Sequence, residues 1–154
     1  MVRDHFQLVK QGLAVHETRD YEKALSIFEE ALKRRSACPN ALYNKANVLH
    51  MLGRDGEALK ILLELIDSND LAYLEGCPEM VETPRSLRLD ALFLSFLCML
   101  DQTGSWKAAS PYLRRHLASR ARGLRSLWSR SQIVAEAEEL RLQYAPRAKS
   151  VKAY

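Results

Sequence analysis

A spacing of 34 residues relates two stretches of the chain, residues 8–31 and 42–65. Each stretch reads as a helix-forming run, a polar turn and a second helix-forming run. Side chains of similar character recur at this spacing in six pairs: Leu8 and Leu42, Gly12 and Ala46, Val15 and Leu49, Ala24 and Ala58, Phe28 and Leu62, and Ala31 and Leu65. Six matches at one period indicate a repeated helical hairpin, and they restrict the fold to a stack of such units.

The repeated positions explain how one hairpin closes. In the first copy, the small residues Gly12 and Ala24 allow the two helices to approach closely, and Phe28 lies four residues further along the same face to fill the core. In the second copy, Gly53 suits the break between the helices. Pro39 opens that copy near the first turn of a helix, where proline is tolerated.

This pattern resembles the tetratricopeptide repeat, across about residues 5–118. The resemblance implies an all-α fold, a right-handed superhelical stack of helix-turn-helix hairpins. It also implies a non-enzymatic module or adaptor that binds a peptide or helix of another protein. The two well-matched copies span about residues 5–38 and 39–72.

A third and looser copy is expected at about residues 90–122. Gly104, Ala109 and Leu113 match the second copy at a shift of 51 residues, which is one period plus an insertion of 17. The insertion is placed at about residues 73–89, where it either extends the preceding helix and forms a surface loop, or folds over the groove. Leu97 replaces the expected small residue and Pro111 lies inside the second helix, so this copy is expected to pack at a different angle or to kink.

Residues 1–123 therefore form the predicted repeat domain. A segment at residues 124–145 has apolar residues at roughly helical spacing and is expected to cap the open end of the stack. Residues 146–154 are polar and basic and are expected to be disordered.

Composition limits the remaining possibilities. The chain has 154 residues, enough for one domain with a real core. Its most apolar run, residues 91–100, is too short to span a membrane, which takes about 20 residues. The N-terminus carries Asp4 where a signal peptide would be apolar, so a cytoplasmic location is expected.

No sequence motif indicates catalysis or a cofactor. The three cysteines, Cys38, Cys77 and Cys98, form no C-x-x-C pair, so neither a disulfide framework nor a zinc motif is indicated. The four histidines form no H-x-x-x-H arrangement, and the chain lacks a phosphate-binding glycine loop. The prediction is therefore no enzyme, no cofactor and no metal ligand.

The first helices of stacked hairpins line a concave groove. Asn44 and Asn47 are expected to hydrogen-bond the main chain of a bound peptide, and Tyr43 to add an apolar surface with a polar tip. One subfamily grips a carboxylate with lysine, asparagine and arginine, but only Asn44 matches, so an apolar or helical partner segment fits better. The predicted groove residues are Val9, Lys10, Leu13, Tyr43, Asn44, Asn47, His50, Leu94, Ser95 and Cys98.

The C-terminal half is basic. Residues 1–76 hold 10 Lys and Arg against 12 Asp and Glu, whereas residues 77–154 hold 13 against 7. The candidate basic face consists of Lys107, Arg114, Arg115, Arg120, Arg122 and Arg125. Three interpretations stay open: a solvated face, a surface for an acidic protein, and a surface for nucleic acid, which no motif supports. A further alternative is a self-associating scaffold, in which the acidic half of one copy binds the basic half of another. Another is a secretion-type chaperone, which the pI of about 9.0 disfavours.

Overall fold

Helices account for nearly all of the described chain. The computed structural model describes residues 4–68, 83–120 and 126–145. The helices in these ranges are α1 (His5–Glu17), α2 (Tyr21–Arg34), α3 (Pro39–Met51), α4 (Asp55–Asp67), α6 (Pro84–Thr103), α7 (Trp106–Ser119) and α8 (Arg130–Tyr144). The predicted all-α class is confirmed. None of the helices described is long and apolar enough to cross a membrane.

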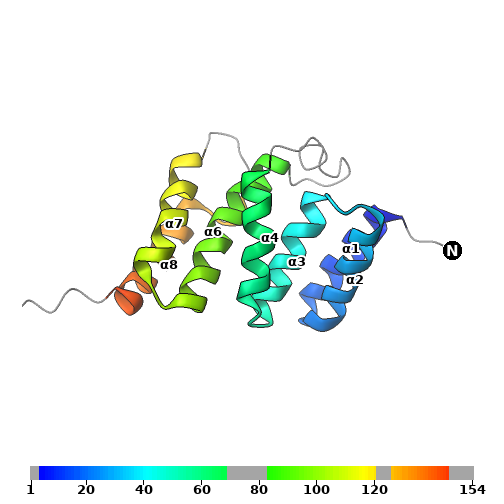
Figure 1. Cartoon of the computed structure of the whole chain (residues 1–154), viewed down its shortest axis with the longest axis horizontal. Helices are drawn as coiled ribbons and strands as arrows, with labels where there is room; N and C mark the ends of the chain where they lie inside the picture. The colour runs from blue at the N-terminus through cyan, green and yellow to red at the C-terminus, as the bar shows by residue number, and fades with distance from the viewer. Residues whose placement is uncertain (1–3, 69–82, 121–125, 146–154) are drawn as a thin grey trace, which may run out of the picture.

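The helices pack as consecutive hairpins. The pairs are α1 with α2, α3 with α4, and α6 with α7, and each pair contacts the next through α2 on α3 and α4 on α6. The pairs follow one another along the long axis of the molecule, and α8 lies against α7 at the end of the row (Figure 1). The predicted stack of hairpins with a C-terminal capping helix is what the structure contains.

Short-range sequence signals set the ends of the helices. The side chain of Asp4 accepts a hydrogen bond from the backbone N–H of Gln7, and Gln7 returns one to the backbone of Asp4, which makes a capping box for α1. Ser129 and Gln132 form the same box for α8. Gly104 ends α6 in the left-handed conformation, with a φ of 64°.

Two core clusters divide the stack. The N-terminal core joins α1, α2, α3 and α4 to one side of α6, and its α6 members are Leu87, Ala91, Leu94 and Cys98. The C-terminal core joins the other side of α6 to α7 and α8 through Phe93, Phe96, Leu100, Ala109, Leu113, Ile133 and Ala137. Because α6 is buried on two sides, its sequence is apolar nearly all round, which explains the run at residues 91–100.

Several predicted boundaries need correction. Helix α6 begins at Pro84 rather than near residue 90, so the last part of the expected insertion is helical. Helix α8 begins at Arg130 rather than near residue 124, because Ser129 caps it and residues 126–129 lead into it without helical structure. Helix α7 continues through Pro111. Most of the insertion, residues 121–125 and the basic tail lie outside the described residues.

The predicted close approach of α1 and α2 occurs at Gly12. A Cβ atom added there would lie 2.5 Å from Cε1 of the buried Phe28 ring. That distance is too short for any real contact, so the absence of a side chain at Gly12 is required by the packing of Phe28.

Gly12→Ala is therefore expected to lower the free energy of unfolding by about 1–3 kcal/mol, the usual range for overpacking a core. Alanine is the better helix former by about 1 kcal/mol, but the buried ring cannot move away as an exposed side chain would. Urea denaturation followed by circular dichroism measures the change. Gly56→Ala is the matched control, because its Cβ would meet only the end of the Gln102 side chain at 3.1 Å. Equal effects of the two substitutions would contradict the prediction.

The C-terminal core contains a buried histidine. Nδ1 of His116 lies 2.7 Å from the carbonyl oxygen of Leu89, and Nε2 lies 3.1 Å from a guanidinium nitrogen of Arg120. The first contact needs a proton on Nδ1 and the second needs a lone pair on Nε2, so the neutral imidazole fits. Burial lowers the pKa of His116, and the charge of Arg120 acts in the same direction, against the hydrogen bond to Leu89.

We expect this histidine to make the fold less stable in acid. In the unfolded chain a histidine takes up its proton at about pH 6.5, whereas folded His116 still excludes it. Below that pH the unfolded state binds more protons, so the free energy of unfolding falls as the pH falls, until folded His116 is itself protonated. Denaturation at a series of pH values measures the slope. His116→Asn retains a donor toward Leu89 without titrating, and an unchanged slope in that variant would refute the assignment.

Candidate functional site

The ten residues predicted to line the groove fall into a buried and an accessible set. Buried are Val9, Tyr43, Leu94, Ser95 and Cys98. Their predicted position on an open surface is wrong, because α1 contacts α3 and α3 contacts α6 directly, which covers the side chains between them. Accessible are Lys10, Leu13, Asn44, Asn47 and His50, which are half-buried or exposed.

Part of the accessible set is already bound within the protein. The amide nitrogen of Asn44 donates to the carbonyl oxygen of Asn40 at 2.7 Å, one turn earlier in α3. Nζ of Lys10 lies 5.3 Å from the centre of the Phe6 ring, a cation–π contact. Lys10, Leu13 and Asn47 are here called the accessible strip. Together with His50, they are the predicted groove residues that a partner could still reach.

The predicted basic face is also divided. Lys107, Arg114 and Arg115 are exposed on α7. Arg120 is half-buried and donates to the carbonyl oxygen of Trp128 at 3.2 Å, so it joins α7 to the segment before α8 rather than facing a partner. The remaining two predicted members, Arg122 and Arg125, lie outside the described residues.

Three arginines surround a pocket that the sequence analysis did not anticipate. The pocket has a volume of about 270 Å³ and lies between the end of α4, the start of α6 and the end of α7. One guanidinium nitrogen of Arg88 is buried and has no hydrogen-bond partner among residues 4–68, 83–120 and 126–145. This arginine pocket is lined by Ile66, Arg85, Arg88, Leu89, Leu92, Arg115 and Ser119.

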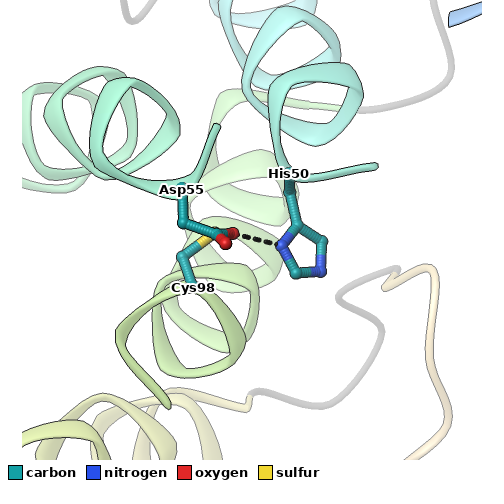
Figure 2. Close-up of side chains that lie close together, drawn as sticks. All are labelled: His50, Asp55 and Cys98. Atoms are coloured by element: carbon teal, nitrogen blue, oxygen red, sulfur yellow. Dashed lines mark hydrogen bonds and ion pairs between the residues drawn. The ribbon is translucent and has the colours of Figure 1, made fainter. Parts of the chain in front are cut away.

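A second group of side chains meets where the turn between α3 and α4 touches α6. His50 lies in the last turn of α3, Asp55 begins α4, and Cys98 lies in the C-terminal half of α6 (Figure 2). Nδ1 of His50 lies 2.6 Å from Oδ1 of Asp55, and one potential ligand atom from each of the three residues lies within 4.8 Å of the others. Oδ2 of Asp101 is 3.7 Å from the same His50 nitrogen. These four residues are here called the His–Asp–Cys cluster.

Local geometry explains why these residues meet. Gly53 has a φ of 75° in the turn between α3 and α4, and its N–H donates to the carbonyl oxygen of His50 at 2.9 Å. This tight turn keeps His50 and Asp55 close together. Cys98 and Asp101 are three residues apart, and therefore share one face of α6.

The electrostatics of the cluster disfavour a reactive thiol. Burial raises the pKa of Cys98 far above its ordinary value, and the charges of Asp55 and Asp101 and a hydrogen bond to Asp55 add to the effect. The thiol stays protonated at neutral pH, whereas nucleophilic cysteines need the opposite shift. Burial also raises the pKa of Asp101, as does the charge of Asp55, while His50 opposes them. Over the described ranges, His50 is the only basic side chain within ion-pair distance of either carboxylate.

The two groups were missed for different reasons. Arg85 and Arg88 lie in the stretch assigned to the insertion, which was expected to extend the preceding helix and form a surface loop or to fold over the groove, and not to begin α6. The members of the cluster come from three helices, and their order along the chain matches no short metal or catalytic motif. The spacing of the repeats could have revealed part of the cluster. Asp101 follows His50 by the same 51 residues that relate the second and third copies, so the two residues occupy equivalent positions.

Comparison with known proteins supports the repeat. A sequence model of the family described as tetratricopeptide repeat matches residues 9–72, which contain most of α1 and all of α2, α3 and α4. No curated protein and no solved structure matches the chain.

Proposed function

We propose that this chain, which belongs to the tetratricopeptide repeat family through residues 9–72, is a non-enzymatic interaction module. Such repeats generally serve in protein–protein interaction. In this proposal the arginine pocket holds an acidic segment of a partner protein. The partner group is a carboxylate, supplied by an acidic side chain or by a chain terminus. This proposal takes up the acidic-partner alternative and moves it to residues that the structure brings together.

The buried guanidinium nitrogen of Arg88 is the observation that carries the proposal. A buried donor without a partner costs about 1–3 kcal/mol, and more when it is charged. In the part of the chain that is described, none of Arg85, Arg88 and Arg115 forms an ion pair with an acidic residue. A carboxylate in the pocket would accept from these guanidinium groups, in the bidentate geometry that favours arginine over lysine.

The lining of the pocket favours a protein segment over nucleic acid. Ile66, Leu89 and Leu92 add apolar surface beside the arginines. An Asp or Glu side chain, or a chain terminus with an apolar last residue, offers both an anion and an aliphatic part. A phosphate backbone would instead require a row of exposed cations along a path.

Selection from a displayed peptide library tests this function. Peptides enriched on the wild-type protein should carry Asp, Glu or a C-terminal carboxylate, and synthetic versions should bind in fluorescence anisotropy. Arg88→Gln should weaken them by at least about tenfold, since truncating one partner of a buried charge pair costs about 2 kcal/mol or more. Arg141→Gln is the control, because Arg141 is exposed on α8 and its one ion pair among the described residues is with Glu138 of the same helix. Enrichment of uncharged peptides, or equal binding by both variants, would refute the proposal.

The accessible strip is a second candidate surface. Lys10 and Asn47 lie on first helices of adjacent hairpins, where the family resemblance places a peptide groove. Lys10→Ala with Asn47→Ala tests it in the same assay, and loss of binding there alone would place the peptide on the strip. Tyr43→Ala is unsuitable for this purpose, because the Tyr43 side chain is 1% exposed and its removal would disturb the core.

A further inference from the structure

We propose that His50, Asp55 and Cys98 (Figure 2), together with Asp101, bind one Zn²⁺ ion, which joins the turn of the second hairpin to α6. This inference does not depend on the arginine pocket or on any partner. It concerns a site that no family property assigns.

The donor atoms suit zinc. The cluster offers one imidazole nitrogen, one sulfur and carboxylate oxygens, and Zn²⁺ accepts all three kinds of ligand in tetrahedral sites. Calcium and magnesium bind oxygen almost exclusively, so the imidazole and the thiol count against them. Among common divalent ions, the mixed set of nitrogen, sulfur and oxygen therefore favours zinc.

The geometry needs only small side-chain movements. Bonds of about 2.0–2.3 Å to a tetrahedral ion place ligand atoms about 3.2–3.8 Å apart. The His50 to Asp101 distance, 3.7 Å, is already within this range. The His50 to Asp55 distance, 2.6 Å, is that of a direct hydrogen bond and has to open slightly. Cys98 is near enough as well, because the three ligand atoms lie within 4.8 Å of one another.

The charges of the cluster are those of a cation site. Two carboxylates and a buried thiol converge, and within the described ranges no Lys or Arg forms an ion pair with either carboxylate. Arg54, which neighbours Asp55 in sequence, is paired with Glu57 at 2.8 Å. Asp55, Cys98 and Asp101 all lie close to His50, and a bound dication would offset the repulsion between two carboxylates and a thiolate.

Binding follows a balanced exchange of protons. The thiol of Cys98 loses its proton to solvent and binds as a thiolate. The proton on Nδ1 of His50, which lies in the hydrogen bond to Asp55, is released to solvent, and the ion takes its position. The imidazole then binds in its neutral form, with its remaining proton on Nε2. Asp55 and Asp101 bind as carboxylates. No bond to carbon is made or broken, and no electron is transferred.

The site is accessible to an ion from one side. Cys98 is fully buried, whereas the side chain of Asp101 is 48% exposed. Both Asp55 and Asp101 also line a pocket of about 360 Å³ beside the turn, together with Gly53, Arg54, Gly56, Glu57 and Gln102. An ion can thus reach the carboxylates first and the thiolate last.

Metal titration of the whole chain tests the proposal. The protein is purified, stripped with a chelator and titrated with Co²⁺, and then with Zn²⁺ in competition with a chromophoric chelator. We expect one ion per chain, strong visible bands of tetrahedral Co²⁺, and a near-ultraviolet band from charge transfer between thiolate and cobalt. Zn²⁺ should displace Co²⁺ and raise the Tm of the protein.

Variants assign the ligands. Cys98→Ala should abolish the charge-transfer band, and His50→Gln and Asp55→Asn should each weaken Zn²⁺ binding by at least about tenfold, the smallest loss reported for disturbing residues around a metal. Asp101→Asn is the variant least able to disturb folding, because its side chain is the most exposed of the four, and it should weaken binding too. Cys38→Ser and Cys77→Ser are the matched controls and should bind as the wild type does. Circular dichroism confirms that each variant is folded.

Three results would overturn the inference. One is a wild-type chain that binds no Zn²⁺ more tightly than the competing chelator. Another is a charge-transfer band that survives in Cys98→Ala or disappears in Cys38→Ser or Cys77→Ser. The third is wild-type affinity in a folded Asp101→Asn and a folded His50→Gln, which would place the ion elsewhere.

Discussion

Phe93→Ala is expected to lower the free energy of unfolding by about 3–5 kcal/mol, the range for removing a buried aromatic side chain. Phe93 is fully buried in the C-terminal core. Its ring meets Trp128 edge-on at a centroid distance of 4.9 Å, and the rings of Phe96 and His116 each lie 5.8 Å away. Alanine would leave a cavity among residues of α6, α7 and the segment before α8, which cannot all move inward together.

The loss should be regional as well as large. Stacked hairpins contact mainly their neighbours, so their stability is nearly a sum of local terms. Hydrogen exchange in Phe93→Ala should therefore show greater loss of protection in α7 and α8 than in α1 and α2, which belong to the N-terminal core. Denaturation by urea gives the total loss. Leu142→Ala, at a side chain that is 67% exposed, should change neither quantity. Uniform loss of protection along the chain would show that the two cores unfold as one unit.

The sequence predicts the hairpins well because their closure is a local matter. Gly12 must be small since Phe28 occupies the space opposite, and both residues belong to one hairpin. The turns at Gly53 and Gly104 need backbone conformations that glycine adopts readily, with φ values of 75° and 64°. Signals of this kind depend on residues within one period, so a spacing of 34 residues makes them visible.

The groove was predicted less well because its walls depend on contacts between hairpins. Tyr43 and Leu94 point away from the partner helix of their own hairpin, and on that ground they were predicted to line the open face. In the stack, however, α3 also packs against α6, and these side chains fill the space between them. An apolar residue on a first helix is thus shared between two possible neighbours, and periodicity alone does not distinguish them.

The His–Asp–Cys cluster shows what the copies could have revealed. Cys98 and Asp101 in the third copy correspond to Asn47 and His50 in the second, each at a distance of 51 residues. Equivalent positions on neighbouring first helices lie side by side in a stack, which brings Asp101 close to His50. The repeat spacing could not have predicted that Asp55 joins the cluster, because the position of the Asp55 side chain depends on the conformation of the turn at Gly53.

Asp90→Ala is expected to lower the free energy of unfolding by about 3–6 kcal/mol, a loss comparable to that of Phe93→Ala but of different origin. Asp90 is 1% exposed. Its carboxylate accepts from the hydroxyl of Ser126 at 2.5 Å and from the backbone N–H of Leu127 at 3.2 Å. Hydrogen bonds to a charged acceptor contribute about 1.5–3 kcal/mol each, and alanine would leave both donors without this acceptor. Urea denaturation measures the loss, and Asp90→Asn, which retains an oxygen acceptor, should lose less.

A double-mutant cycle separates this anchoring role from a simple loss of buried volume. If Asp90 acts by holding residues 126–129 against α6, then Ser126→Ala removes part of the same interaction. The loss of unfolding free energy in the double variant should then be smaller than the sum of the two single losses, by about 0.5–3 kcal/mol. Asp90→Ala should also expose Trp128, whose fluorescence then shifts to longer wavelength, because the segment that carries it loses its attachment. Additive costs would mean that Asp90 and Ser126 act independently. An unshifted spectrum would mean that the packing of Trp128 on Phe93, rather than the carboxylate, positions α8.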